Sequence, residues 1–80
     1  MIVNKQELID EFNELGNLQI KLNDGGTIEI EQCIDYIVAE RIGYNKVMKS
    51  MCFVEHYGNF FDIESLLETL EKKGILNFID

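Results

Sequence analysis

The residues best suited to metal binding or nucleophilic catalysis in this sequence are two cysteines and one histidine. Cys52 and His56 are four residues apart, so a helix would place thiol and imidazole on one face, with Cys33 as a third ligand. A strand would hold the pair about 13 Å apart, too far to share a ligand sphere. Zinc sites usually take four ligands in paired spacings, and a cysteine nucleophile needs an orienting group. We therefore expect no metal site, no cofactor and no catalytic residue.

The glycine pair and the carboxylates do not indicate a catalytic site either. Gly25-Gly26 is shorter than a phosphate-binding loop and follows Asp24, whose charge would repel phosphate, so a turn explains it. The sequence marks no two carboxylates as a general acid and a general base. We expect a protein that is not an enzyme, and a metal or catalytic protein using Cys52 and His56 is the third alternative.

Charge is distributed unevenly along the chain. The sequence has 15 acidic residues against 7 Lys and Arg, for a formal net charge of −8. Residues 1–40 carry a net −7, residues 41–54 carry +3 without any acidic residue, and residues 55–80 carry −4. Such a balance disfavours direct binding to nucleic acid or to anionic membranes.

Four carboxylates of the first predicted helix form the main candidate binding surface. At 100° per residue they fall within an arc of about 100° opposite the apolar side, and only Lys5 accompanies them. The candidate residues are Glu7, Asp10, Glu11 and Glu14, with Glu29 and Glu31 added by a predicted hairpin. Helix carboxylates three or four residues apart are separated by about 6 Å, similar to neighbouring phosphates. A solvated outer face is the simpler explanation of the same residues.

The helix that carries these carboxylates is predicted over residues 4–15. Asn4 followed by Glu7 forms a capping-box pattern, and Val3 can pack on Leu8. Gly16 can end the helix in the left-handed conformation.

Two strictly alternating segments around the glycine pair predict a β-hairpin. The strands cover residues 18–22 and 27–31. To keep the apolar side chains on one face, we expect Leu22 opposite Ile28 and Ile20 opposite Ile30. This register leaves residues 24–26 as a three-residue loop with a left-handed Gly26.

The middle of the chain is expected to be helical. Apolar residues at helical spacing predict a helix over about residues 32–42, although no good N-cap precedes it. These residues are Cys33, Ile34, Ile37, Val38 and Ile42. Residues 46–57 fit either a helix or a strand, and we favour the helix.

The last helix is expected to begin after Asp62, a good N-cap, with Phe61 packed on Leu66. Gly74 can end it in a Schellman motif. The apolar run at residues 75–79 can add a short strand to the edge of the hairpin.

These elements predict one compact, acidic α+β domain over residues 1–80. Its order is an N-terminal helix, a β-hairpin, two or three helices and an optional C-terminal strand. The chain has no signal-peptide or membrane-spanning segment, so we expect a cytoplasmic protein that does not bind membranes.

The function that we expect is a non-enzymatic binding module. It would be a phage-type inhibitor that docks its acidic surface on the basic nucleic-acid-binding surface of a partner protein, such as a nucleic-acid-handling enzyme, and occludes that surface. Anti-CRISPR proteins and nucleic-acid mimics are of this class, and the comparison is one of class alone. The alternative is a small adaptor or homodimer that associates through an apolar Met and aromatic surface of Met51, Tyr57 and Phe60.

Overall fold

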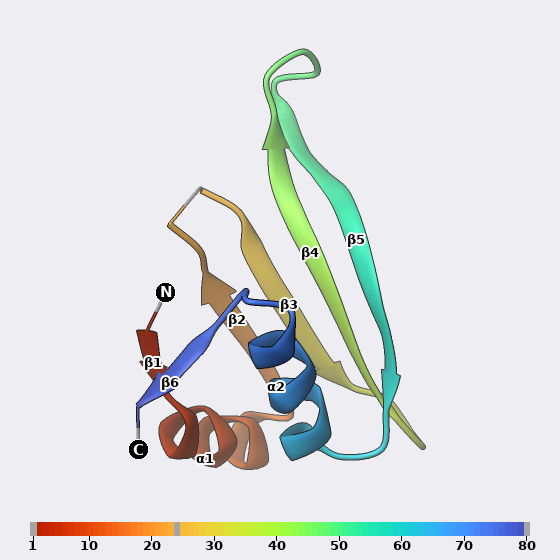
Figure 1. Cartoon of the computed structure of the whole chain (residues 1–80). Coiled ribbons are helices and arrows are strands. Elements are labelled where there is room, and N and C mark those ends of the chain that lie inside the picture. Colours follow the sequence, from red (N-terminus) through yellow and green to blue (C-terminus); the bar gives the residue numbers. More distant parts are fainter. Residues whose placement is uncertain (1, 24, 80) are drawn as a thin grey trace.

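A four-stranded antiparallel sheet organises the fold in the computed structural model, which describes residues 2–23 and 25–79 (Figure 1). The elements are β1 (Ile2–Asn4), α1 (Lys5–Leu15), β2 (Asn17–Lys21), β3 (Thr27–Gln32), β4 (Ile37–Asn45), β5 (Ser50–Phe60), α2 (Ile63–Lys72) and β6 (Asn77–Ile79). Strands β2, β3, β4 and β5 are neighbours in chain order, and β1 pairs with β6 in a separate parallel ladder. The fold is therefore mostly β, with one helix before the sheet and one after it.

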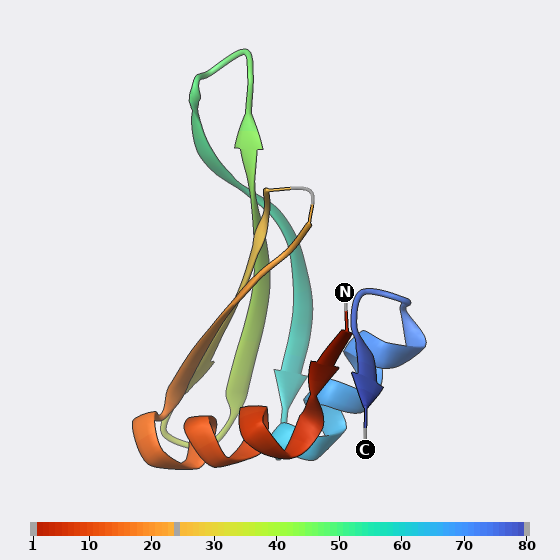
Figure 2. The same ribbon diagram turned by 90° about the vertical axis from the view of Figure 1, so that its left-hand side faces the viewer.

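The core lies between one face of the sheet and the two helices. Apolar side chains alternate along the strands, and those on the inner face meet Phe12 of α1 and the apolar side of α2. The fully buried large side chains are Ile28, Ile30, Leu66, Leu67, Leu70 and Leu76. The opposite face of the sheet carries no helix, and we call it the open face (Figure 2). Among the described residues, no helix is long and apolar enough to cross a membrane.

The predicted helices over residues 32–42 and 46–57 are wrong, and the predicted fold class is wrong with them. Residues 37–45 form β4 and residues 50–60 form β5. In β4, Ile37 and Ala39 are buried whereas Val38 between them is half-buried, which is a strand pattern of burial. The helical spacing was fortuitous, because Ile34 lies in the turn before β4 and is 97% exposed. The β-branched residues of this segment favour a strand.

The first hairpin is confirmed, but its predicted register is wrong by two residues. Ile20 pairs with Ile28 and Leu18 pairs with Ile30. A shift of two residues keeps every side chain on its face, so alternation alone cannot distinguish the two registers. The Leu22 N–H donates to the Gly26 carbonyl at 2.8 Å, so Leu22 lies opposite Gly26 instead of Ile28.

The left-handed glycine of this loop is Gly25, with φ 88°, rather than Gly26. The Gly25 N–H donates to the Leu22 carbonyl at 3.2 Å, which closes the turn on the Leu22 side. Asp24, which we placed in the loop, lies outside the described residues.

The two terminal helices form where their capping residues predict. The Asn4 side chain accepts from the Glu7 N–H at 3.0 Å, and α1 ends at a left-handed Gly16. For α2, the Asp62 side chain accepts from the Ser65 N–H at 2.7 Å. The helix ends in a Schellman motif, because the Ile75 N–H donates to the Leu70 carbonyl at 3.0 Å.

Two expectations about the ends of α2 need correction. Phe61 is 91% exposed, so it does not pack on Leu66, which is buried in the core. The C-terminal strand forms, as β6, but it pairs with β1 instead of the hairpin. Both helices cover the same face of the sheet, and this brings the segment before α1 beside the segment after α2 (Figure 1).

The α2 cap makes the stability of the helix dependent on pH. Hydrogen bonds from the Ser65 backbone N–H, and then from its side chain, lower the pKa of Asp62. The contribution of the ionised cap is therefore complete above the pKa of Asp62 in the unfolded chain, and it is lost as pH falls through the lower folded pKa. We expect Asp62→Ala to lower the free energy of unfolding at neutral pH, and its difference from the unmodified protein to shrink in acid. Urea unfolding at a series of pH values measures this difference, and Asp62→Asn, which does not titrate, should show less destabilisation at neutral pH.

Candidate functional site

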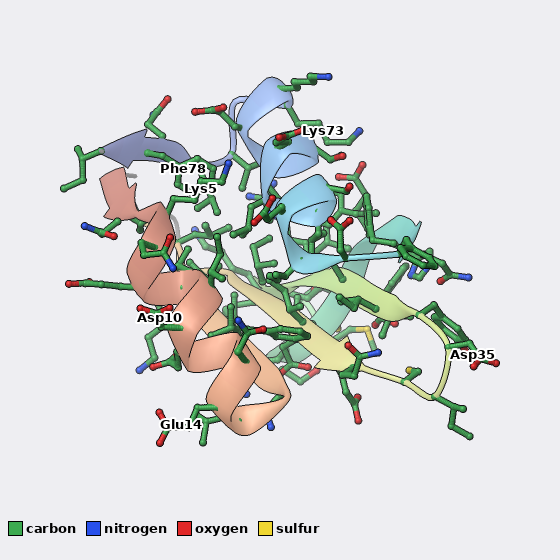
Figure 3. All side chains as sticks on the ribbon, turned by 90° about the horizontal axis from the view of Figure 1, so that it is seen from below. Lys5, Asp10, Glu14, Asp35, Lys73 and Phe78 are labelled. Carbon is green, nitrogen blue, oxygen red and sulfur yellow. The ribbon has the colours of Figure 1, made fainter. Side chains whose placement is uncertain are left out.

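The acidic face of α1, formed by Glu7, Asp10, Glu11 and Glu14, is exposed along the whole helix. The helix buries Phe12 on its opposite side and packs Leu8 and Ile9 against the core. Figure 3 shows Asp10 and Glu14 on the side of α1 that points away from the sheet and α2. The folding of this local segment therefore places the four carboxylates on one accessible surface.

The basic residue of α1 does not neutralise this surface. Lys5 Nζ lies 5.8 Å from the centroid of the Phe78 ring, a cation–π contact that points it toward β6 (Figure 3). Among residues 2–23 and 25–79, no salt bridge is formed by any carboxylate of the acidic face, and Asp10 accepts a hydrogen bond from the Gln6 amide at 2.9 Å. The acidic face therefore keeps its full negative charge exposed to solvent.

Glu29 and Glu31 do not extend the acidic face of α1. Both are exposed residues of β3 that alternate with buried Ile28 and Ile30, so they lie on the open face of the sheet. Glu29 accepts a hydrogen bond from the Gln19 amide at 3.2 Å, and it pairs with Glu40 of β4. The sheet separates these carboxylates from α1, so the six predicted acidic residues form two surfaces.

The cysteines and the histidine are not brought together as a site. Cys52 pairs with Gly43 in the distal half of the β4–β5 hairpin, and Cys33 lies in the turn at the other end of β4. His56 pairs with Glu40, with its Nδ1 at 3.8 Å from Glu40 Oε1. Among the described residues, no group of three or more His, Cys, Asp or Glu side chains could hold a metal ion.

The three residues of the alternative apolar surface occupy different environments. Tyr57 is 8% exposed and belongs to the core, and Phe60 packs against that core. Lys73 Nζ lies 5.9 Å from the Tyr57 ring centroid on the α2 side. Met51 is exposed near the distal end of β5. These three side chains therefore do not form one surface.

An exposed apolar surface does exist, and Met51 is the one predicted interface residue that belongs to it. Strands β4 and β5 are longer than β2 and β3, so their distal part projects beyond the rest of the sheet (Figures 1 and 2). We call residues 41–54 the arm. Its exposed large apolar residues are Tyr44, Val47, Met48, Met51, Phe53 and Val54. The signal in the sequence was the segment over residues 41–54, which has no acidic residue and combines many apolar residues with Arg41, Lys46 and Lys49.

The tip of the arm is an ordered turn. The Asn45 side chain accepts from the Val47 N–H at 2.9 Å and from the Met48 N–H at 3.0 Å, which holds both apolar side chains outward. Lys49 follows with φ 53°, a left-handed conformation that is uncommon for lysine. The tip therefore presents two lysines and two apolar side chains in a defined geometry.

Comparisons with protein-family models, curated proteins and solved structures found no match for this chain.

Proposed function

We propose that this protein is a non-enzymatic inhibitor that places the acidic face of α1 on the basic nucleic-acid-binding surface of a partner protein and so blocks that surface. The observation that supports this function most directly is the position of Lys5. Its contact with Phe78 removes the one basic side chain of α1 from the four carboxylates. The acidic face can then meet the lysines and arginines of a partner without first breaking an internal ion pair.

The mechanism is steric and electrostatic. Carboxylates separated by one helical turn present negative charges at a spacing similar to that of phosphates on a nucleic-acid strand. Opposite charges on two proteins steer their encounter, and salt screens this attraction over about 8 Å at physiological ionic strength. Binding should therefore be fast at low salt, weaker at high salt and in competition with nucleic acid.

The first experiment identifies the partner and tests occlusion together. The protein is immobilised and exposed to a nuclease-treated host lysate at about 0.05 M and about 0.5 M salt, which changes the screening length roughly threefold. The proposed function requires a basic nucleic-acid-handling protein that is retained at low salt, reduced at high salt and displaced by added DNA or RNA. Retention that is indifferent to both salt and nucleic acid would contradict it.

Removing three charges from the acidic face should slow association with that partner. We expect Glu7→Gln combined with Glu11→Gln and Glu14→Gln to reduce the association rate constant by at least about tenfold at low salt, because steering is lost. The three side chains are exposed, so the free energy of unfolding should change little. Stopped-flow or surface-based kinetics measures the rate constants.

A matched control removes the same charge from the other helix. Glu64, Glu68 and Glu71 are exposed on α2, and their replacement by glutamine changes the net charge of the protein equally. This control variant should associate nearly as fast as the unmodified protein. Equal slowing by both variants would mean that total charge, and not the acidic face of α1, governs binding.

A further inference from the structure

The arm exposes more apolar surface than a small monomeric protein normally leaves in water. Phe53 is 60% exposed and Tyr44 is 58% exposed, although both lie within paired strands. Neither helix covers these side chains, because both helices lie on the other face of the sheet and the arm beyond Ile42 also extends past the end of β3 (Figure 2). Contiguous apolar patches of this kind mark interaction surfaces.

The register of β4 places the apolar and charged residues of the open face in successive rows. Ile42 pairs with Phe53, and the next row toward the tip pairs Tyr44 with Met51. All four share the open face, because Thr27, the β3 partner of Ile42, alternates with the buried Ile28. The apolar patch on this face is therefore two rows long.

Acidic residues follow on the same face toward the base of the sheet. Glu40 pairs with both His56 and Glu29, and the row below it contains Glu31 beside Val38. Beyond the opposite end of the open face, the turn at the tip of the arm carries two lysines, Lys46 and Lys49. Along β4 and β5 the charge therefore changes from basic at the tip, through the apolar rows, to acidic at the base, and Lys21 of β2 lies beside Thr27 at the edge of the Ile42–Phe53 row.

This order of charges is complementary to itself when one copy is turned by half a revolution. Lys46 lies four residues above the Ile42–Phe53 row and Glu31, beside Val38, lies in the row four residues below it. Four residues of extended strand span about 13 Å, which is the distance from the Ile42–Phe53 row to the Glu31 row, and Lys46 lies in the turn just beyond the end of β4 at Asn45. A two-fold axis through the Ile42–Phe53 row would therefore bring the lysine tip of each copy to the carboxylates of the other, with the apolar rows in contact between them.

We propose that the arm binds a second copy of this chain, as a two-fold dimer in which the open faces pack with their arms antiparallel. The interface consists of the apolar rows at the centre and the lysine–carboxylate contacts at each end. Two-fold dimers use one self-complementary patch in this way, and sheets that pack face to face bury the side chains of both inner faces. The acidic face of α1 lies on the other side of the sheet and stays exposed in this dimer.

The dimer is tested on the full chain by sedimentation velocity over a wide range of protein concentration. The unmodified protein should sediment with the mass of two chains at high concentration. Phe53→Glu and Met51→Glu each put a charge into the apolar rows, and each should raise the dissociation constant by at least about 30-fold, the loss typical of a central contact. Both residues are exposed in the monomer, so circular dichroism and the unfolding midpoint should stay close to those of the unmodified protein.

Ile34→Glu is the matched control. Ile34 is a large, exposed apolar residue in the turn between β3 and β4, away from the arm, and its replacement should leave the dimer intact. A protein that stays monomeric at every concentration would overturn the proposal, and so would a dimer that Phe53→Glu and Met51→Glu leave unchanged. A monomeric protein whose arm retains another protein in a pull-down, with loss on Phe53→Glu, would assign the arm to that partner.

Charge reversal tests the antiparallel arrangement itself. Lys46→Glu with Lys49→Glu makes both ends of the open face acidic, and Glu29→Lys with Glu31→Lys makes its base basic, so each double variant alone should lose the dimer. An equimolar mixture of the two should form a heterodimer, because one tip–base contact is then a reversed pair and the other is the original pair. If each variant alone loses the dimer and the mixture does not recover it, the antiparallel arrangement is incorrect.

Discussion

Replacing Leu67 by alanine should lower the free energy of unfolding by about 2–5 kcal/mol, the largest effect that we expect from a single apolar truncation. Leu67 is 0% exposed on the side of α2 that packs on the sheet. Its truncation removes buried methyl groups and leaves a cavity that the surrounding side chains fill only in part. Because small domains have only about 5–10 kcal/mol of stability in total, the variant should unfold at much lower urea concentration. Urea unfolding followed by circular dichroism measures the change.

Leu15→Ala is the control for this prediction. Leu15 has the same side chain at the end of α1, but it is 59% exposed, and alanine is a good helix former. We expect a change below about 0.5 kcal/mol. Similar losses for the two variants would contradict the assignment of α2 as the element that closes the core.

The helices and their exposed carboxylates could be predicted because their signals are local. Asn4 and Gly16 delimit α1 within one short segment, and Asp62 and Gly74 do the same for α2. Once α1 is placed, its period of 3.6 residues fixes which side chains face outward. Predicting the acidic face of α1 therefore required no knowledge of long-range contacts.

Strand β4 was missed, and β5 was only the less favoured alternative, because apolar residues also occupy the face of these strands that turns away from the core. Ile42 and Phe53 are apolar residues on the open face, where an ordinary strand would carry polar ones. Two register shifts also change the phase of β5 along its length, between Val38 and Glu40 and again between Arg41 and Ile42 on its partner. Ile42, one of the apolar residues whose spacing suggested a helix, also belongs to the proposed dimer contact, and such conflicts between local pattern and fold are expected at functional sites.

The division of the acidic residues into two surfaces also required the tertiary structure. Alternation in β3 predicts that Glu29 and Glu31 share the outer face of the hairpin, but it does not say where the acidic face of α1 lies relative to that face. Because α1 and α2 cover the inner face, the strand carboxylates are left on the open face beside the arm. The two proposals therefore use opposite sides of one sheet, and a dimer through the arm would present two acidic α1 helices to a partner.

The bulge at Gly58 determines which side chains of β5 reach the core. Phe60 pairs with the buried Ile37, and His56 pairs with Glu40 on the open face. Strict alternation from Phe60 would turn Tyr57 away from the core, but the extra residue at the register shift turns it inward, where it is 8% exposed. Gly58 accommodates this shift with φ 103°, a conformation that L side chains rarely adopt.

Gly58→Ala should therefore lower the free energy of unfolding by about 1–3 kcal/mol, the cost of a residue held in a disfavoured backbone conformation. The cost is conformational and not steric, because a Cβ at this position would meet no atom within 4 Å. Tyr57 should also become more exposed as the bulge relaxes. Urea unfolding measures the stability, and the near-ultraviolet circular dichroism of the tyrosines reports the change at Tyr57.

Gly43→Ala, on strand β4 opposite β5, is the matched control, because there the added Cβ meets a close contact but the backbone conformation is ordinary. A Cβ there would lie 3.0 Å from Val54 Cγ2, so the contact is tight, but Gly43 does not have a positive φ. Val54 is exposed and its side chain can move aside, while alanine reduces the conformational entropy of the unfolded chain. We expect the two effects to leave a change below about 0.5 kcal/mol. If Gly43→Ala were the more damaging substitution, close packing within the arm, and not backbone conformation at the bulge, would limit the stability of β5.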